Sequence, residues 1–311
     1  MFSKLYGQEV LVTGAAGFIG ANLVAALERH GAKVHALVRE TTDLSRLKTL
    51  EANPNLVVAE LTDFERVDSV VAALRPDYLF HLAVARDEAD WRAMFDTNVT
   101  ATLRLLKSAA TPALKKFVHL CSSLEYGKSD GPLSETARPR PEQFYGATKA
   151  AAAIFLQQAA HADGLPAVML RPFHVFGPLE PSNRLIPSAI QAGLRGEELR
   201  LTAPGIRHDF IYVQDVVRAC LMAACADGLH GRIFNIASGS QWTNEEVVAE
   251  IGRILGAPIK TATGRYSARD WDRSCWEVDI SVAARGMGWK PEHDLHNGLV
   301  KSVAWLKRSV A

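Results

Sequence analysis

Residues 13–20 read Thr-Gly-Ala-Ala-Gly-Phe-Ile-Gly, and this glycine-rich stretch decides the fold class of the chain. It follows an apolar run at 9–12 with the length of a buried strand, and it precedes a segment of helical period. Such a turn between a first strand and a first helix is the context in which a dinucleotide pyrophosphate binds. Gly14 permits the tight turn, Gly17 lets the backbone approach the phosphates, and Gly20 lets helix and strand pack closely. The stretch predicts a dinucleotide-binding unit, with a tight turn that binds nothing as the alternative.

Apolar runs of strand length continue to alternate with helical segments along the first half of the chain. The strand-like runs lie at 34–38, 56–59, 78–83, 117–121 and 167–170, and the helical segments at 21–30, 64–74, 91–110 and 147–161. Because the runs contain few polar residues, we expect strands buried on both faces, as in a parallel sheet between two layers of helices. The pattern predicts an α/β fold with a Rossmann-type doubly wound parallel sheet.

Beyond the last of these strands the pattern becomes irregular and rich in proline, which indicates a second, smaller region. We predict a dinucleotide-binding domain at 1–172 and a smaller, discontinuous substrate-binding domain at 173–207 and 237–311. The segment near 208–236 holds a strand-helix unit that begins near Phe210 and a further strand. Both strands are expected to return to the main sheet.

The bulk composition argues against several classes of partner. The 311 residues hold 35 Lys+Arg against 34 Asp+Glu, so the basic excess that binding to a phosphate backbone requires is missing. No nucleic-acid partner is expected. The first residues do not form a charged region followed by an apolar one, and no stretch approaches roughly 18 apolar residues. Neither secretion nor membrane insertion is predicted.

The cysteines are scattered through apolar or mixed surroundings, without the paired spacing of a metal site. They are Cys121, Cys220, Cys225 and Cys275. We interpret them as free buried thiols, which predicts no bound metal and is typical of a protein in the reducing cytoplasm.

The end of the second predicted strand bears on the choice of dinucleotide. Binders of NAD keep an acidic residue there for the ribose 2′-hydroxyl, whereas this chain has Arg39 after Val38. An arginine can pair with a 2′-phosphate through two parallel hydrogen bonds, so NADP is favoured over NAD. The adjacent Glu40 weakens this prediction, and a solvated surface arginine is the alternative.

Tyr145 and Lys149 stand four residues apart at the start of an alanine-rich helix, a spacing that places both side chains on one face. A neighbouring ammonium stabilises a phenolate and lowers the tyrosine pKa from its usual value of about 10. We therefore predict that Tyr145 is an acid/base that works near neutral pH. The same spacing also occurs by chance on ordinary helices.

Cys121-Ser122-Ser123 follows the strand at 117–121, and the carboxyl end of a parallel strand is where open α/β sheets bind ligands. A serine hydroxyl at this place can hydrogen-bond the substrate oxygen that Tyr145 protonates or deprotonates. The alternative is a pair of serines that cap a turn.

In combination these motifs resemble the extended short-chain dehydrogenase/reductase family, in its branch of nucleotide-sugar epimerases, dehydratases and 4-ketoreductases. The resemblance covers nearly the whole chain. The matching elements are the TGxxGFIG turn at 13–20, Phe80-His81-Leu82-Ala83-Val84, Asn98, the Ser-Ser and Tyr-Gly pairs within 122–127, Tyr145 with Lys149, LRPFxVFGP at 170–178 and DFIYVxDVV at 209–217.

The resemblance implies an NAD(P)-dependent enzyme that acts at a secondary alcohol or ketone, and it implies a role for each matching residue. Ser122 takes the catalytic Ser/Thr role, with Ser123 as the fallback, Tyr145 is the acid/base, and Lys149 also holds the nicotinamide ribose. The residues expected to bind the cofactor are Gly14, Ala16, Gly17, Phe18, Ile19, Arg39, Glu60, Leu61, Leu82, Ala83, Val84, Asn98, Tyr145, Lys149 and Pro172.

On the substrate side the chain departs from the family. His174 stands where the family has the asparagine of RPFN, and His208 stands where it has the arginine of RDF. Arginines in the smaller region remain natural partners for a diphosphate, although each one alone can be a surface charge. The residues expected to bind substrate are Ser123, His174, Arg184, Arg207, His208 and Arg269.

The departures also bear on the reaction. Family dehydratases place acidic residues directly after the catalytic Ser/Thr, and here Ser123 and Leu124 follow Ser122, so 4,6-dehydration is disfavoured. We expect an NADP-linked reductase of a 4-keto nucleotide sugar. The alternatives are a nucleotide-sugar 4-epimerase with tightly bound NAD, a reductase of a non-nucleotide carbonyl, and a non-catalytic dinucleotide sensor. By the resemblance, helices at 91–110 and 147–161 are expected to form the interface of a homodimer, with packing of the alanine-rich face against the chain's own sheet as the alternative.

Overall fold

The first strand lies inside a seven-stranded sheet of the computed structural model, which describes residues 2–127, 131–264 and 276–310. The strands of this sheet are β1 (Glu9–Thr13), β2 (Lys33–Val38), β3 (Asn55–Val58), β4 (Tyr78–His81), β5 (Lys116–Leu120), β6 (Ala167–Pro172) and β10 (Ile233–Ile236). Their order is β10-β6-β5-β4-β1-β2-β3, and every neighbouring pair is parallel. The chain runs outward from β1 to β3 and then crosses to β4, so the sheet is doubly wound and the predicted fold class is confirmed.

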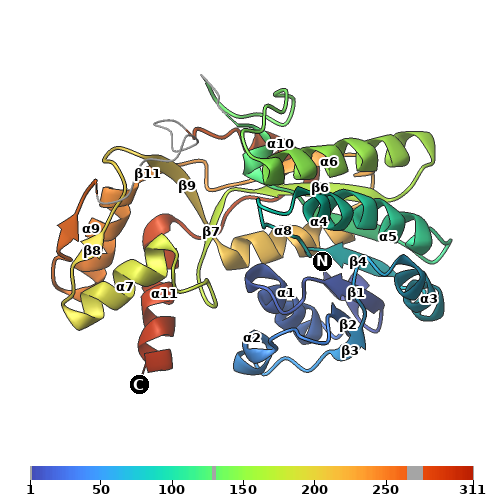
Figure 1. Ribbon diagram of the computed structural model, residues 1–311, viewed down its shortest axis with the longest axis horizontal. Helices are drawn as coiled ribbons and strands as arrows, with labels where there is room; N and C mark the ends of the chain where they lie inside the picture. Colours follow the sequence, from blue (N-terminus) through green and yellow to red (C-terminus); the bar gives the residue numbers. More distant parts are fainter. Residues whose placement is uncertain (1, 128–130, 265–275, 311) are drawn as a thin grey trace.

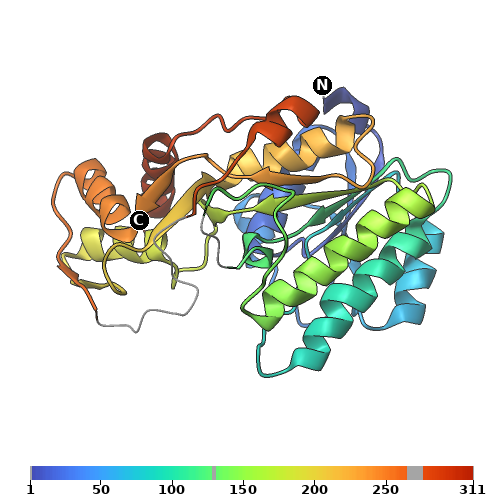
Figure 2. The same ribbon diagram turned by 90° about the horizontal axis from the view of Figure 1, so that it is seen from above.

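Helices cover both faces of this sheet (Figures 1 and 2). They are α1 (Phe18–Arg29), α2 (Ser45–Thr49), α3 (Phe64–Leu74), α4 (Trp91–Phe95), α5 (Ala101–Ala109), α6 (Phe144–Ala162), α8 (Val213–Cys225) and α10 (Ser281–Met287), with 3-10 turns η1 (Phe2–Leu5) and η3 (Ser123–Glu125). On one face α1 packs against α8, and on the other α5 packs against both α3 and α6. In the described part of the chain, no helix is long and apolar enough to cross a membrane.

Alternate residues of β1 point into two different hydrophobic cores. Val10 and Val12 lie in the core beneath α1 and α8, whereas Leu11 lies in the core beneath α3, α5 and α6. Successive residues of a strand face opposite sides of a sheet, so a strand covered on both faces is apolar without interruption. The predicted free thiols are confirmed at the three described cysteines, which are buried; Cys275 lies outside the described residues.

The predicted helix at 91–110 consists of α4, a π-helical turn η2 (Asp96–Thr100) and α5. The predicted helix at 147–161 begins three residues earlier, at Phe144, so Tyr145 lies in the first turn of α6. A carboxylate from another segment stabilises this early start. Glu88 accepts hydrogen bonds from the backbone amides of Phe144 (3.2 Å) and Tyr145 (3.1 Å), where the helix dipole favours negative charge.

A smaller lobe lies beside the main body (Figure 1). It contains a three-stranded sheet of β7 (His174–Phe176), β9 (Arg207–Tyr212) and β11 (Gln241–Thr243), and a pair of short strands, β8 (Leu199–Arg200) and β12 (Thr261–Ala262). Its helices are α7 (Leu185–Arg195), α9 (Asn244–Leu255) and α11 (Leu295–Val310). By contrast, α10 lies against β10 of the main sheet.

The prediction that the strand near Phe210 returns to the main sheet is wrong. This strand, β9, pairs in parallel with β7 and antiparallel with β11. Only the helix after it, α8, returns to the main body, where it packs against α1. The return of the strand at 233–236 is confirmed, because β10 pairs with β6. A buried apolar run shows that a strand is covered, but it does not show which sheet the strand joins.

Candidate active site

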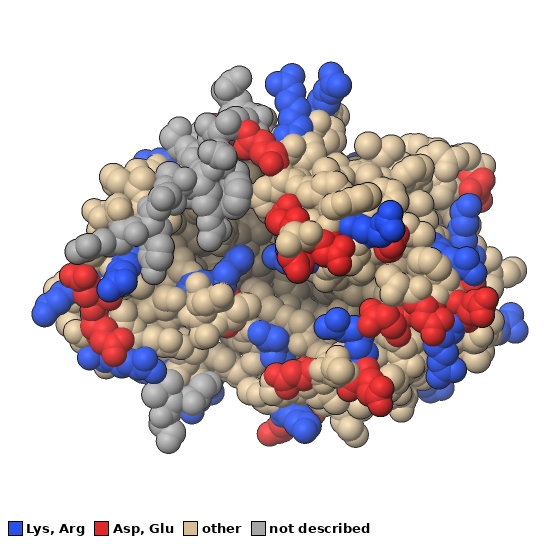
Figure 3. Space-filling model, viewed as in Figure 1, with Lys and Arg blue, Asp and Glu red and all other residues tan. Residues whose placement is uncertain are grey.

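The carboxyl ends of the parallel strands bring the predicted residues to one edge of the main sheet. β1 ends before the glycine turn, β4 ends before the loop 82–86, and β5 ends before Ser122. β6 ends at Pro172 and the chain enters β7 of the small lobe at His174, so this edge faces that lobe. The space-filling view shows a hollow between the main body and the small lobe (Figure 3).

The glycine turn has the geometry of a pyrophosphate site. Gly14 has a φ of +66°, and a Cβ there would lie 2.6 Å from the backbone nitrogen of Ala83. Gly17 is the N-cap of α1 and has no side chain to occupy the first amides of the helix. An anion can therefore approach these amides and the positive end of the helix dipole. The residues of this turn fit the pyrophosphate of a dinucleotide.

Arg39 lies exposed directly after β2, as its predicted role requires. Its backbone amide donates to Oγ1 of Thr42 at 2.9 Å. Its guanidinium forms no hydrogen bond or ion pair with any residue in the described ranges. Glu60 is exposed and Leu61 is buried just after β3, the neighbouring strand. The side chain of Arg39 is thus available to a ligand at this edge.

Asn98 connects the loop after β4 to helix α6. Its Oδ1 accepts from the amide of Ala85 at 2.8 Å, and its Nδ2 donates to the carbonyl of Ala85 at 2.9 Å and to Oγ1 of Thr148 at 3.0 Å. Asn98 sits in the π-helical turn, and such turns are frequent at functional sites. Because Thr148 precedes Lys149, Asn98 positions the loop after β4 relative to this part of α6.

Tyr145 is 6% exposed, and its phenol contacts an arginine that the sequence motifs did not identify. Nη2 of Arg86 donates a hydrogen bond to Oη of Tyr145 at 3.2 Å. The guanidinium carbon also lies 4.7 Å from the centroid of the phenol ring. In the sequence, Arg86 is a single basic residue in the loop after β4. It belongs to no recognised motif, so nothing in the sequence placed it beside Tyr145.

The expected lowering of the Tyr145 pKa below its usual value is wrong for this structure. Burial raises the pKa of Tyr145, and this effect outweighs the charge of Arg86 and the Ser122 side chain, which both lower it. The spacing of Tyr145 and Lys149 places them on one helix face, but it does not reveal how far the pair is removed from water. At neutral pH the phenol therefore keeps its proton.

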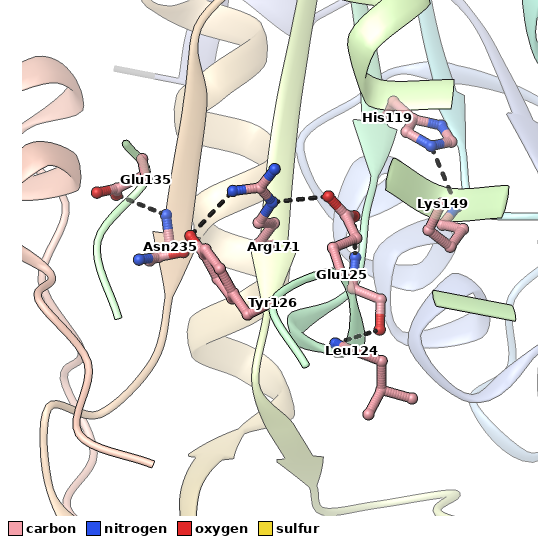
Figure 4. Close-up of polar contacts among 9 residues, drawn as sticks. His119, Leu124, Glu125, Tyr126, Glu135, Lys149, Arg171 and Asn235 are labelled. Atoms are coloured by element: carbon pink, nitrogen blue, oxygen red, sulfur yellow. Dashed lines mark hydrogen bonds and ion pairs between the residues drawn. The ribbon is translucent and has the colours of Figure 1, made fainter. Parts of the chain in front are cut away.

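Lys149 contacts a buried histidine, as Figure 4 shows. Its Nζ lies 3.1 Å from Nε2 of His119, and the two residues are 2% and 0% exposed. Burial lowers the pKa of Lys149 to about 8. Burial and the nearby Lys149 hold the pKa of His119 well below its usual range, so this imidazole is neutral. A second buried histidine, His81, stacks on His119 with ring centroids 5.2 Å apart.

Ser122 caps the short turn η3 in a reciprocal arrangement. Its Oγ accepts from the amide of Leu124 at 3.2 Å, while its own amide donates to Oε1 of Glu125 at 2.9 Å. A hydroxyl that accepts a bond from a backbone amide still has its own proton to donate. The capping interpretation and the catalytic one are therefore compatible at Ser122.

The carboxylate that holds Ser122 is anchored by a chain of buried polar groups (Figure 4). Nε of Arg171 donates to Oε2 of Glu125 at 2.8 Å, and Nη1 of Arg171 donates to Oη of Tyr126 at 2.9 Å. The phenol of Tyr126 donates in turn to Oδ1 of Asn235 at 2.6 Å. This chain links η3 to β6 and β10, so it fixes the position of η3.

Ser123, the first of the predicted substrate residues, begins η3 in the main body, whereas the other described ones lie in the small lobe. His174 on β7 and His208 on β9 are neighbours, with ring centroids 4.6 Å apart. Arg207 has Nη1 3.9 Å from an oxygen of Glu246, and Arg184, at the N-cap of α7, has Nε 3.8 Å from Oε1 of Glu180. Arg269 lies outside the described residues. Between residues 2 and 310, over the described ranges, no group of His, Cys, Asp and Glu side chains is arranged to hold a metal ion.

Comparison with known proteins identifies the family. The model of the NAD dependent epimerase/dehydratase family matches residues 10–237. The chain belongs to this family. The predicted resemblance is confirmed, and the protein is an enzyme of the extended short-chain dehydrogenase/reductase kind.

Members of this epimerase/dehydratase family with different activities are similar to the chain over almost its full length. The dTDP-glucose 4,6-dehydratase of Neisseria meningitidis serogroup B is 29% identical, with 96% of this chain and 93% of the relative covered. The UDP-glucose 4-epimerase of Mycolicibacterium smegmatis is 31% identical, with 96% and 98% covered. The structure of MoeE5 in complex with UDP-glucuronic acid and NAD is 31% identical and matches with a TM-score of 0.84, covering 97% of this chain and 99% of that one.

Proposed function

We propose that this enzyme transfers a hydride at C4 of a nucleotide-activated sugar and that its net reaction is the reduction of a 4-keto sugar. The observation that carries this proposal is the state of Tyr145 beside Ser122. Burial raises the pKa of Tyr145, so the phenol is protonated at neutral pH. Reduction of a ketone requires an acid at its oxygen, whereas oxidation of an alcohol requires a base.

A reduced nicotinamide dinucleotide held at the glycine turn would supply the hydride for the new C–H bond at C4. The carbonyl electron pair moves onto the sugar oxygen, which takes the proton of Tyr145. The hydroxyl of Ser122 donates a hydrogen bond to the same oxygen and holds it in place. Tyr145 is left as a phenolate, and a proton from solvent then restores the phenol. Lys149, on the same helix face, would hold the nicotinamide ribose.

The geometry argues against 4,6-dehydration. Elimination of water needs a carboxyl group free to exchange a proton with the sugar. The acid nearest to Ser122 along the chain is Glu125, and its two oxygens are engaged by the amide of Ser122 and by Arg171. Because Glu125 is 0% exposed, it has no access to a substrate.

A nucleotide-sugar 4-epimerase is the second candidate, and the similarity to the UDP-glucose 4-epimerase of Mycolicibacterium smegmatis supports it. An epimerase removes hydride from C4 and returns it to the other face, so it keeps its cofactor bound and consumes none. It uses the same residues as the reductase. The behaviour of the cofactor therefore distinguishes the two candidates.

We propose NADP as the preferred cofactor, because Arg39 is exposed at the end of β2 and its guanidinium is available to a 2′-phosphate. The structural relative named above contains NAD, so NAD is the alternative. We also propose that the regions 173–207 and 237–311 bind the nucleotide sugar, with Arg184, Arg207 and the two histidines of the small lobe contributing. The free buried thiols favour the reducing cytoplasm.

A homodimer is proposed from the outer surface of α4 and α6. Large apolar side chains remain exposed there, namely Trp91 (55%), Phe95 (43%), Phe144 (36%), Ile154 (58%) and Phe155 (47%). α4 packs beside α6, so these residues lie on neighbouring helices (Figure 1). An exposed apolar patch of this kind marks an interaction surface. A second copy of the chain would cover the patch by pairing the same helices about a two-fold axis.

The first experiment identifies the cofactor and its turnover. Mass spectrometry of the denatured protein reveals any dinucleotide retained through purification, and calorimetry of the stripped protein compares NADPH with NADH. Tighter binding of NADPH, together with its oxidation on addition of a 4-keto nucleotide sugar, supports the reductase. Tightly retained NAD, with interconversion of C4 epimers and no net oxidation of the cofactor, would refute the reductase and support the epimerase. Reduction of simple ketones alone, or no turnover at all, would refute both the reductase and the epimerase.

A further inference from the structure

A guanidinium group lies directly against the phenol of Tyr145. Arg86 follows β4 in the loop that leads to α4, and its Nη2 donates to Oη of Tyr145 at 3.2 Å. The same guanidinium lies 4.7 Å from the centroid of the phenol ring. We propose that Arg86 is part of the acid/base machinery and stabilises the phenolate that Tyr145 becomes when it gives up its proton.

Lys149 is an incomplete source of positive charge for this purpose. Its Nζ is directed to Nε2 of His119, and no hydrogen bond joins Lys149 to Tyr145 among the described residues. Burial lowers the pKa of Lys149 to about 8, so its charge disappears as the pH rises through that value. Arginine stays protonated over the whole working range of an enzyme. The charge of Arg86 therefore persists when that of Lys149 is lost.

The other charged groups around Tyr145 have partners of their own. Glu125, on η3, raises the pKa of Tyr145 but is paired with Arg171 at 2.8 Å. Glu88 accepts from the backbone amides at the start of α6. Arg86, in contrast, forms no ion pair within the described ranges, and its one side-chain hydrogen bond there goes to the phenol of Tyr145. Its charge is thus directed at the phenol.

The inference rests on the proposed role of Tyr145 as the proton donor. It assigns to Arg86 an effect on one equilibrium, the ionisation of that phenol. A nearby opposite charge favours the ionised form, so removal of the guanidinium must raise the Tyr145 pKa further. A residue that merely filled space would leave the ionisation unchanged.

The test measures the ionisation of Tyr145 without substrate. The tyrosines are replaced biosynthetically by 3-fluorotyrosine, which ionises at lower pH than tyrosine, and the ¹⁹F resonance of residue 145 is assigned with Tyr145→Phe. The resonance is then titrated in the full-length protein. In Arg86→Gln we expect the midpoint to rise by about one pH unit, a tenfold change in the ionisation constant. In Arg86→Lys, which keeps the charge, most of this rise should disappear.

Arg92→Gln is the matched control, because it removes an arginine that lies over Trp91, 5.7 Å from its ring, instead of over Tyr145. It should leave the midpoint unchanged. If Arg86→Gln does not fold, Arg86→Met replaces it and keeps the aliphatic stem. An unchanged midpoint in Arg86→Gln, or in Arg86→Met where that replaces it, overturns the proposal that Arg86 stabilises the phenolate and leaves the proposed reaction intact. Full turnover by Tyr145→Phe would instead overturn the proposed reaction.

Discussion

Glu125 and Arg171 form an ion pair of 2.8 Å in which the two side chains are 0% and 3% exposed. Glu125 also accepts a hydrogen bond from the amide of Ser122, so a buried charge pair determines where the hydroxyl of Ser122 lies. The charge of Glu125 helps to keep Arg171 protonated, since it raises the pKa of that guanidinium. Removal of one partner leaves the other charge buried and uncompensated.

We expect Glu125→Gln to lower the free energy of unfolding by about 3–5 kcal/mol, because Arg171 would keep its charge in a buried site without a partner of opposite charge. The measurement is urea denaturation followed by circular dichroism. Asp227→Asn is the control: it removes an ion pair to Lys4 whose acidic side chain is 95% exposed, and it should change stability very little. Equal changes in the free energy of unfolding for the two substitutions would show that the buried ion pair contributes no more to stability than the exposed one.

Tyr145→Phe should reduce kcat by at least about 100-fold, since the substrate oxygen loses its proton donor. The affinity for the dinucleotide should stay within a few fold, because the glycine turn is untouched. Steady-state kinetics and calorimetry provide the two readings. Tyr126→Phe is the matched control: its phenol hydrogen-bonds Asn235 and Arg171 behind the site, so any loss of activity should come with a loss of stability. Retained turnover in Tyr145→Phe would refute the proposed acid.

Glu180 predicts a loss of stability as the pH rises. Its side chain is 2% exposed, Oε2 has no hydrogen-bond partner among the described residues, and burial raises its pKa from 4.5 to about 8. The folded state therefore holds a proton that the unfolded state has released. The stability that comes from this extra proton on Glu180 is fully present below about pH 4.5 and is lost as the pH rises to about 8.

Between these limits the wild type should lose about 1.4 kcal/mol of unfolding free energy per pH unit relative to Glu180→Gln, which has no proton to release. Chemical denaturation at a series of pH values measures this difference. Glu197→Gln, at an exposed position after α7, should parallel the wild type. Parallel curves for the wild type and Glu180→Gln would mean that Glu180 is ionised in the folded protein.

Phe155→Glu should disrupt the proposed homodimer, because it places a charge in the apolar surface of α4 and α6, where Phe155 is 47% exposed. Sedimentation equilibrium should give twice the chain mass of 33.9 kDa for the wild type and the single mass for the variant. Val300→Glu alters a similarly exposed apolar residue (41%) on α11 in the small lobe and should remain dimeric. A wild-type monomer at micromolar concentration would refute the assembly.

Local sequence patterns were sufficient to predict several features of the fold and of the candidate site. The apolar runs around β1, β2 and β4 predicted a sheet buried on both faces, since such strands have no solvent face to carry polar residues. The position of Gly14 predicted a tight turn, and the structure gives this residue a φ of +66°. In the same way, the carboxyl end of β5 predicted the place of Ser122. Each of these features depends on neighbours in the chain or on the regular geometry of a strand.

Other features depended on segments that are distant in the sequence. The pairing of β9 with β7, the contact of Arg86 with Tyr145 and the contact of Lys149 with His119 join residues from separate elements. The sequence alone determined that Ser122 follows a strand and that Tyr145 and Lys149 share a helix face, because strand direction and helix periodicity are local. Only the tertiary structure decided the charges and burial around them, because desolvation depends on everything that packs nearby, and this is why the pKa of Tyr145 is raised and not lowered.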